Sequence, residues 1–139
     1  MQTLGSKPDG REWIIGIADP KEPSSAIAQL HFTGSLALVT SGSYQRYFEE
    51  DGIRYHHILD PATGRPVENG LASVTVLADS GTMADAYSTA LFVMGMEQAV
   101  QFWRQEQNFE AIFILEDGSI FATRGAAAML QGCEFTEIK

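Results

Sequence analysis

The chain has 139 residues, which is enough for one domain with a buried core, and its 45% hydrophobic and 19% charged residues are typical of a globular protein. Eighteen acidic against nine basic residues give a net charge of −9, so no basic field attracts nucleic acid and we exclude that class of partner. Cys133 is the single cysteine, no internal disulfide is possible, and no apolar run reaches the length of a transmembrane helix.

Short apolar runs between turn signals predict much of the chain as strands. In chain order they lie at residues 13–17, 26–32, 36–40, 46–50, 53–58, 73–77, 109–115 and 119–123. We expect the second and third of these strands to pair with each other around a short glycine turn. The dipeptides Asp51-Gly52 and Asp117-Gly118 predict hairpin turns, whereas residues 60–69, with two prolines, predict a loop.

Two helices are predicted after the strand at residues 73–77. Residues 83–95 are rich in Ala, Leu and Met, which favour a helix, and Gly95 is placed to end it in a left-handed cap. Because this segment is apolar on nearly all sides, we expect it to be buried against a sheet. Residues 96–107 predict a second, amphipathic helix. The order of elements predicts an α+β fold in which a mixed sheet is packed by a buried central helix.

Asp85 and Thr89 are polar residues within the first predicted helix, four residues apart and therefore on one face. A carboxylate and a hydroxyl at the start of a buried helix suit a hard cation such as Mg²⁺, which prefers oxygen ligands. The same residues also suit a capping arrangement, in which Thr82 is the N-cap and Asp85 occupies the third helical position. Thr89 would then bond back to the carbonyl of Asp85. These residues alone leave both interpretations open.

His56 and His57 stand at the end of a predicted strand, where a histidine can act as a general base or a ligand. Neighbouring residues of a strand point to opposite faces, so the two rings cannot both join one site. The alternative is that one histidine is solvated and the other packs, while Asp60 begins a turn through Pro61.

Three stretches of the sequence resemble, in order, three signatures of one family. They are TSGSYQRYF at residues 40–48, HILDPATGRP at residues 57–66 and ADAYSTALFVMG at residues 84–95. The family is that of the ApbE-like FAD:protein FMN transferases, formerly called thiamine biosynthesis lipoproteins. Residues 7–13 and the turn at 17–20 resemble the segment that precedes these signatures. The signature usually has Asp where this chain has Ser43.

The resemblance implies the C-terminal half of an ApbE-like fold, with residues 1–139 as a single portion of a domain whose upstream half is missing. In the family that half supplies further contacts to the flavin and to the metal ion. We therefore expect one sheet face to lack a cover, and a homodimer or a partner with the upstream half to cover it. The family also implies the cell envelope or periplasm, although this chain shows no signal peptide or lipidation cysteine near its start.

The family's reaction moves FMN from FAD to a Thr or Ser of an acceptor protein and depends on Mg²⁺. Carried over by position, Asp85 and Thr89 would hold the metal ion, with Ser88 placed to assist. His57 would be the base that accepts the proton of the acceptor hydroxyl. Phosphoryl transfer agrees with such a set, because it needs charge neutralisation and an aligned nucleophile more than covalent help.

The resemblance also implies a flavin site next to these residues. His57, Leu59 and their neighbours would line the FAD, and Ser41 and Gly42 would shape the same wall. Two other functions remain open at this point. One is a hydrolytic variant that splits FAD into FMN and AMP, and the other is a non-catalytic flavin-binding half-domain that is incomplete alone.

Overall fold

The computed structural model describes residues 1–51 and 53–139. Its strands are β1 (Gln2–Thr3), β2 (Trp13–Ala18), β3 (Ala26–Phe32), β4 (Leu36–Gly42), β5 (Tyr47–Glu50), β6 (Ile53–His56), β7 (Leu71–Ala78), β8 (Glu110–Leu115), β9 (Ile120–Thr123), β10 (Leu130–Gln131) and β11 (Thr136–Ile138). Its helices are α1 (Gly81–Met94), α2 (Met96–Glu106) and α3 (Arg124–Ala127).

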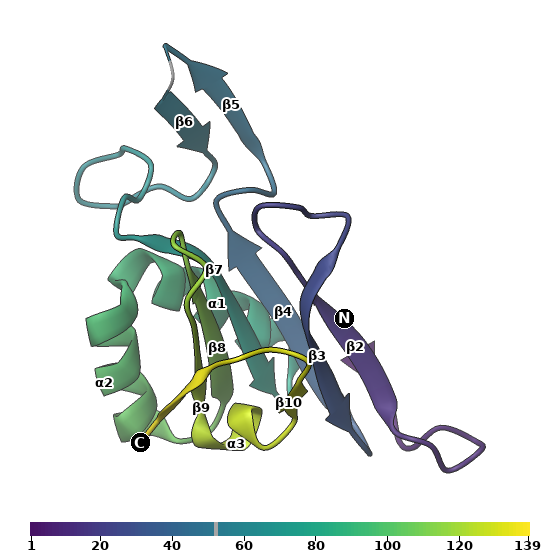
Figure 1. Ribbon diagram of the computed structural model, residues 1–139. Helices are drawn as coiled ribbons and strands as arrows, with labels where there is room; N and C mark the ends of the chain where they lie inside the picture. Colours follow the sequence, from purple (N-terminus) through teal and green to yellow (C-terminus); the bar gives the residue numbers. More distant parts are fainter. Residues whose placement is uncertain (52) are drawn as a thin grey trace.

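The molecule is layered around a main sheet with the strand order β1-β4-β7-β8-β9-β11. Its neighbouring strands are antiparallel, except β9 and β11, which run parallel. A small sheet, with the order β10-β3-β2, packs on one face, and α1 and α2 cover the other (Figure 1). The prediction of an α+β fold with a mixed sheet is therefore confirmed.

Strand β7 shows how the main sheet is covered on both faces. All of its residues are buried, and alternate side chains enter different cores. Val74 and Val76 pack in the core beneath the helices, whereas Leu77 packs in the core between the two sheets. The chain thus covers both faces of this sheet with its own elements. The expectation that one sheet face lacks a cover is wrong.

Helix α1 lies on the main sheet along a single stripe. Its buried residues are Ala84, Ser88, Leu91 and Phe92, which follow the helical period. Positions on the opposite face are exposed, so α1 is half-buried rather than buried on nearly all sides. The helix ends at Gly95, as expected, with φ at 78° but ψ at 166°. The φ is that of a left-handed residue, whereas the ψ is extended, so the cap is not the left-handed helical one.

Helix α2 follows directly and is amphipathic, as the sequence predicts, with Ala99 buried on its inner side. An aromatic cluster joins the two helices, because the Tyr87 ring lies 5.6 Å from that of Phe102 and 4.8 Å from that of Phe109. Trp103 adds a hydrogen bond from its indole nitrogen to the carbonyl of Phe109, at 3.1 Å. In the described part of the chain, no helix is long and apolar enough to cross a membrane.

The prediction that β3 pairs with β4 is wrong. Strand β3 lies between β2 and β10 in the small sheet, whereas β4 lies between β1 and β7 in the main sheet. Their short connection contains Gly34 at φ 89° and carries the chain from one layer to the other. The reason is visible in their burial. Residues of β3 mostly alternate between exposed and buried, whereas β4 is buried on both faces and fits only a sheet that is covered twice.

The last part of the chain contains short elements that the sequence pattern did not predict. Strand β10 pairs with β3, and β11 pairs in parallel with β9, which places Ile138 in the core beneath the helices. Helix α3 begins after Thr123 and holds the buried Ala126. Elements of two to four residues are too short to show a period, so only their tertiary contacts define them.

Strands β5 and β6 form the predicted hairpin, which projects beyond the layers (Figure 1). All residues of β5 are exposed, and Phe48 stacks on its cross-strand neighbour Tyr55 with ring centroids 5.1 Å apart. Asp51 begins the turn at φ 51°, and Gly52 lies outside the described residues. The hairpin therefore relies on its own cross-strand pairs as far as His56, the last residue of β6, which enters the core beside Phe92.

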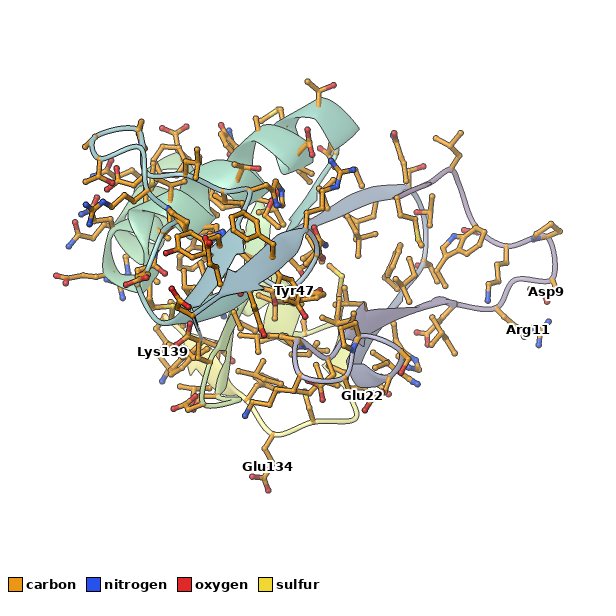
Figure 2. The ribbon with its side chains drawn as sticks, turned by 90° about the horizontal axis from the view of Figure 1, so that it is seen from above. Asp9, Arg11, Glu22, Tyr47, Glu134 and Lys139 are labelled. Atoms are coloured by element: carbon orange, nitrogen blue, oxygen red, sulfur yellow. The ribbon has the colours of Figure 1, made fainter. Side chains whose placement is uncertain are left out.

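A second projection is the loop between β1 and β2. Asp9 and Arg11 lie together at its tip, far from Lys139 (Figure 2). Their ion pair, at 2.5 Å, holds the pKa of the Asp9 carboxyl below its usual value. Both side chains are exposed to solvent, so the pair contributes little to the stability of the fold. A turn at residues 7–10 is closed by a hydrogen bond from Gly10 N to the carbonyl of Lys7.

Candidate active site

The first group of predicted site residues meets where α1 packs on β4. Ser41 Oγ, at the end of β4, lies 2.9 Å from Ser88 Oγ and 3.1 Å from Thr89 Oγ1, both on α1. Ser88 Oγ also donates to the carbonyl oxygen of Asp85, at 3.0 Å. The structure therefore brings four of the predicted residues into one hydroxyl-rich cluster.

Burial divides this cluster into an inner and an outer part. Ser88 is fully buried and Ser41 nearly so, whereas Asp85 and Thr89 are exposed. The expectation that Asp85 and Thr89 lie at a buried helix start is therefore wrong. They lie on the outer face of α1, where a solvated ion or ligand can reach them.

The capping interpretation of Asp85 is also wrong. The N-cap is Ser80, whose Oγ accepts a hydrogen bond from Met83 N, and the helix begins at Gly81. Thr82 is therefore inside the helix and Asp85 is its fifth residue, beyond the amide groups that a cap satisfies. Within the part of the chain that the structure describes, the Asp85 carboxylate makes no hydrogen bond or ion pair.

These residues fit a hard divalent cation. The carboxylate of Asp85 and the hydroxyl of Thr89, one helical turn apart, present oxygen atoms on one exposed face. Among the described residues, no group of three His, Cys, Asp or Glu is arranged to hold a metal ion. A site on this face would thus combine one carboxylate with hydroxyl oxygens and with ligands from outside the chain, as is usual for Mg²⁺.

His57 lies on a second segment, directly after β6, and its ring is exposed. Its backbone N–H and its Nδ1 both contact the carbonyl oxygen of Arg46, at 3.1 and 3.3 Å. A carbonyl oxygen only accepts, so Nδ1 carries the proton in this contact and Nε2 keeps a free lone pair. An imidazole that is oriented through Nδ1 and open at Nε2 has the arrangement of a general base.

His56 has the opposite environment, which confirms the interpretation that one histidine is solvated and the other packs. Its Nε2 donates to the carbonyl of Val67 at 3.0 Å, and its ring meets that of Phe92 edge-on at 5.8 Å. The ring is buried, and among the residues that the structure describes its Nδ1 has no hydrogen-bond partner. His56 therefore joins β6 to the core rather than to a site in solvent.

The loop after His57 is organised by Asp60. Its Oδ1 accepts a hydrogen bond from Ala62 N at 2.8 Å. Its backbone N–H donates to the carbonyl of Arg65, and its carbonyl accepts from Gly64 N, both at 2.8 Å. Leu59 forms an isolated bridge with Pro66 and remains half-exposed. The loop thus presents an apolar side chain next to His57 from a defined turn.

Gly42 occupies a position that admits no side chain. A Cβ there would lie 2.7 Å from the Tyr44 ring and 3.0 Å from the carbonyl oxygen of Ala72. Glycine therefore lets Tyr44 fold back over the end of β4 beside Ser41. The burial of Tyr44 raises the pKa of its hydroxyl above the usual value.

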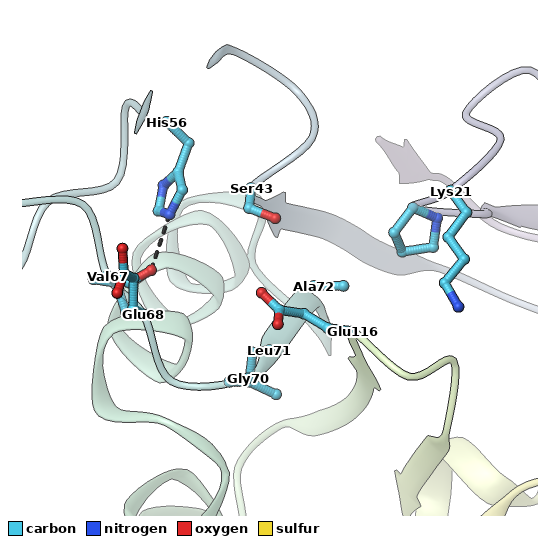
Figure 3. A pocket seen from close by; sticks show the side chains of 10 residues that line it. Lys21, Ser43, His56, Val67, Glu68, Gly70, Leu71, Ala72 and Glu116 are labelled. Carbon is cyan, nitrogen blue, oxygen red and sulfur yellow. Dashed lines mark hydrogen bonds between the residues drawn. The ribbon is translucent and has the colours of Figure 1, made fainter. Parts of the chain in front are cut away.

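A cavity of about 690 Å³ opens beside His56 (Figure 3). Its polar lining comes from Lys21, Ser43, His56, Glu68 and Glu116, which are distant in the sequence. None of the predicted site residues lines it. No sequence pattern indicated the cavity, because the β2–β3 loop and the β8–β9 turn form it only when the two sheets pack.

The predicted site residues thus fall into two groups on different elements. Ser41, Ser88, Thr89 and Asp85 form the hydroxyl-rich cluster at α1, with Gly42 next to it in the chain. His57 and Leu59 belong to the segment after β6, and in the described part of the chain no hydrogen bond joins them to that cluster. Together these features define an α+β protein whose candidate site combines hydroxyl and carboxylate oxygens with an exposed imidazole.

Comparison with known proteins identifies the family of the chain. The model of the ApbE family matches residues 1–113. The chain is 41% identical over 114 residues to the FAD:protein FMN transferase of Treponema pallidum, covering 82% of this chain and 32% of that protein. It is 41% identical over 134 residues to that of Rhodobacter capsulatus, covering 96% and 25%. The chain therefore belongs to the ApbE family.

Solved structures of ApbE proteins also match the fold of this chain. The ApbE protein of Thermotoga maritima matches with a TM-score of 0.78 and 38% identity over 92% of this chain and 41% of that chain. The flavin transferase ApbE of Vibrio cholerae matches with a TM-score of 0.71 and 35% identity over 90% and 40%. The chain thus spans a quarter to a third of these curated relatives and about two fifths of the solved structures.

Proposed function

We propose that the chain contributes the base and the metal-binding residues to a site that transfers FMN from FAD to a Thr or Ser of an acceptor protein. The observation that carries the proposal is the geometry of His57, which is exposed, oriented through Nδ1 by the Arg46 carbonyl and open at Nε2. The names of the relatives, FAD:protein FMN transferase, support the choice of substrate.

In the proposed reaction, Nε2 of His57 accepts the proton of the acceptor hydroxyl as its oxygen attacks the phosphorus on the riboflavin side of FAD. A phosphate ester forms between the acceptor oxygen and FMN, and the anhydride bond to the AMP phosphate breaks. AMP leaves with the electron pair of that bond. The Arg46 carbonyl stabilises the imidazolium that forms, because Nδ1–H donates to it more strongly when the ring is charged.

Asp85 and Thr89 would hold Mg²⁺ on the outer face of α1, with Ser88 assisting from behind. When bound, the ion neutralises charge on the pyrophosphate and on the departing AMP, which an acidic chain does not do by itself. The chain's own contribution is to fix the carboxylate and the hydroxyl one helical turn apart on a helix packed against the main sheet.

The rest of the proposed site comes from a polypeptide outside these residues. The relatives are more than twice as long, and apolar side chains stay exposed beside His57, with Phe48 at 61% and Leu59 at 50%. We propose that His57, Leu59, Ser41 and Gly42 line the FAD on this side and that the remaining part of the fold closes it. A second copy of the chain is the other way to cover this surface.

The test is transfer of FMN in vitro. The chain is incubated with FAD and Mg²⁺, together with the upstream part of a longer relative and that relative's acceptor protein. Mass spectrometry then measures FMN on the acceptor. We expect His57→Ala to slow transfer by about 10²–10⁴-fold, the usual contribution of a positioned base, with FAD affinity nearly unchanged. His31→Ala, in the small sheet, is the matched control and should transfer at the wild-type rate.

Three outcomes would overturn parts of the proposal. Transfer by His57→Ala at the wild-type rate would remove His57 as the base. Conversion of FAD to free FMN and AMP without a labelled acceptor would make the chain part of a hydrolytic enzyme. Binding of FAD with neither reaction would leave a flavin-binding module.

A further inference from the structure

The hydroxyl groups of Ser41, Ser88 and Thr89 form a chain whose direction is fixed at one end. Ser88 Oγ lies 3.0 Å from the carbonyl oxygen of Asp85, which only accepts, so Ser88 uses its single proton there. Ser88 then has no proton for the contact with Ser41 at 2.9 Å. Ser41 must therefore donate to Ser88.

The same reasoning fixes the next hydrogen bond. Ser41 has already used its proton on Ser88, so in the contact of 3.1 Å between Ser41 and Thr89 the donor is Thr89. The protons thus run in one order, from Thr89 to Ser41, from Ser41 to Ser88, and from Ser88 to the Asp85 carbonyl. Hydrogen bonds in such a series polarise and strengthen one another.

The order determines what Thr89 presents to the outside. Its hydroxyl proton points inward to Ser41, so the lone pairs of Oγ1 face solvent on the side that also carries the Asp85 carboxylate. A neutral hydroxyl binds a cation through a lone pair, with its proton turned away from the ion. Thr89 is therefore held in the orientation that a metal ligand needs before any ion arrives.

We infer that Ser41 is a positioning residue of the metal site, which turns the Thr89 hydroxyl into a pre-oriented acceptor. This inference rests on the proposed function only in taking Asp85 and Thr89 as the ion ligands. Ser41 is suited to the role because it belongs to β4 while Thr89 belongs to α1, so one contact fixes both the hydroxyl and the packing of the helix. Ser41 is 8% exposed and Ser88 is 0% exposed, so little water competes for these hydrogen bonds.

Without Ser41, the Thr89 hydroxyl would turn to another acceptor. The carbonyl of Asp85, one turn back in the helix, is the usual choice for a helical threonine. The proton would then no longer be held at the sheet, and the ion would have to reorient the group on binding. Residues that orient metal ligands from behind typically change the affinity by about 10–100-fold when they are removed.

The test uses Mn²⁺, which takes the same oxygen ligands as Mg²⁺, and follows the free ion by electron paramagnetic resonance as the chain is titrated. We expect Ser41→Ala to weaken Mn²⁺ binding by about 10–100-fold. Ser41→Thr keeps the hydroxyl and should bind Mn²⁺ as tightly as the wild type does. Thr40→Val is the matched control. It removes a hydroxyl from the same strand, but one that contacts Thr75 at 2.8 Å, so its ion affinity should equal that of the wild type.

Asp85→Ala separates failure of this inference from failure of the proposed site. If Ser41→Ala binds Mn²⁺ like the wild type while Asp85→Ala does not, the metal site stands and the role of Ser41 is refuted. If the wild type binds no Mn²⁺, the metal site fails and the inference with it. Should Ser41→Ala not fold by circular dichroism, Ser41→Gly also removes the hydroxyl, and wild-type affinity in that variant refutes the inference equally.

Discussion

The two groups of site residues lie on two different kinds of structure. One lies on helix α1, which packs on the main sheet, and the other lies on the segment from β5 to Asn69. On α1, Asp85 and Thr89 are exposed but stand on a helix whose other side fills a core with Leu91 and Phe92. In the second region, His57 and Leu59 belong to a hairpin and loop that project from the layers (Figure 1). The first group is positioned by the packing of α1 on the main sheet, and the second by hydrogen bonds together with the buried side chains of Ile58 and Val67.

The second region is nevertheless attached to the first at defined points. The buried His56 donates to the Val67 carbonyl and meets the Phe92 ring. Asn69 Nδ2 donates to the carbonyl of Phe92 at 2.7 Å, while its Oδ1 accepts from Leu71 N at 3.2 Å. Phe92 is thus one residue of α1 at which the segment is attached. The comparison shows that a projecting segment can be positioned by the few residues that it buries in the core of the main fold.

The largest effect is expected at the shared residue. Phe92→Ala removes a fully buried ring from the core beneath the helices and should lower the free energy of unfolding by about 3–5 kcal/mol. Met94→Ala, on the exposed side of the same helix, should change it by less than about 0.5 kcal/mol. Urea denaturation followed by circular dichroism measures both. Equal effects for the two variants would mean that α1 is not packed as described.

The packed region is also the one that the sequence predicts best. Helix propensity and Gly95 place α1, and the Asp117-Gly118 turn places β8 and β9, because these signals are local. The start of α1 was misplaced because Ser80 and Thr82 are both good N-caps, and the choice depends on where β7 ends. The false pairing of β3 with β4 has the same origin, since nearness in the sequence does not show which sheet a strand joins.

The candidate site divides in a similar way. The residue types and the ordered motifs indicate Asp85, Thr89 and His57, and the alternation of side chains along a strand separates His56 from His57. What the sequence does not show is the contact of Ser41 with Ser88 and Thr89, because it joins residues 47 and 48 positions apart. The exposure of Asp85 was also missed, since an Ala-rich helix does not reveal which side faces the sheet.

The second effect concerns the attachment of the projecting segment. His56→Phe keeps a ring against Phe92 but leaves the buried Val67 carbonyl without its donor, which should cost about 1–3 kcal/mol. His56→Gln places an amide donor near the position of Nε2 and should cost less. Hydrogen exchange should then rise in His56→Phe at the Val67 amide, which donates to Ile58, and fall back in His56→Gln. Equal exchange in both variants would show that the hydrogen bond does not hold the segment.

The smallest effect is expected at the tip of the second region. Phe48→Ala removes the stacking with Tyr55. Such an aromatic pair contributes about 0.5–1.5 kcal/mol, and here it stabilises only the hairpin. The global free energy of unfolding should change by less than about 0.5 kcal/mol, because Phe48 is 61% exposed and belongs to neither core. Hydrogen exchange at the Tyr55 amide, which belongs to a hydrogen-bonded pair of the hairpin, should instead rise, while the amides of β7 keep their protection. A loss of global stability as large as that of His56→Phe would place the hairpin within the cooperative core and remove the distinction between the two regions. An unchanged exchange rate at Tyr55 would show that the backbone pairing of β5 and β6, rather than the stacked rings, keeps His57 in its place after the hairpin.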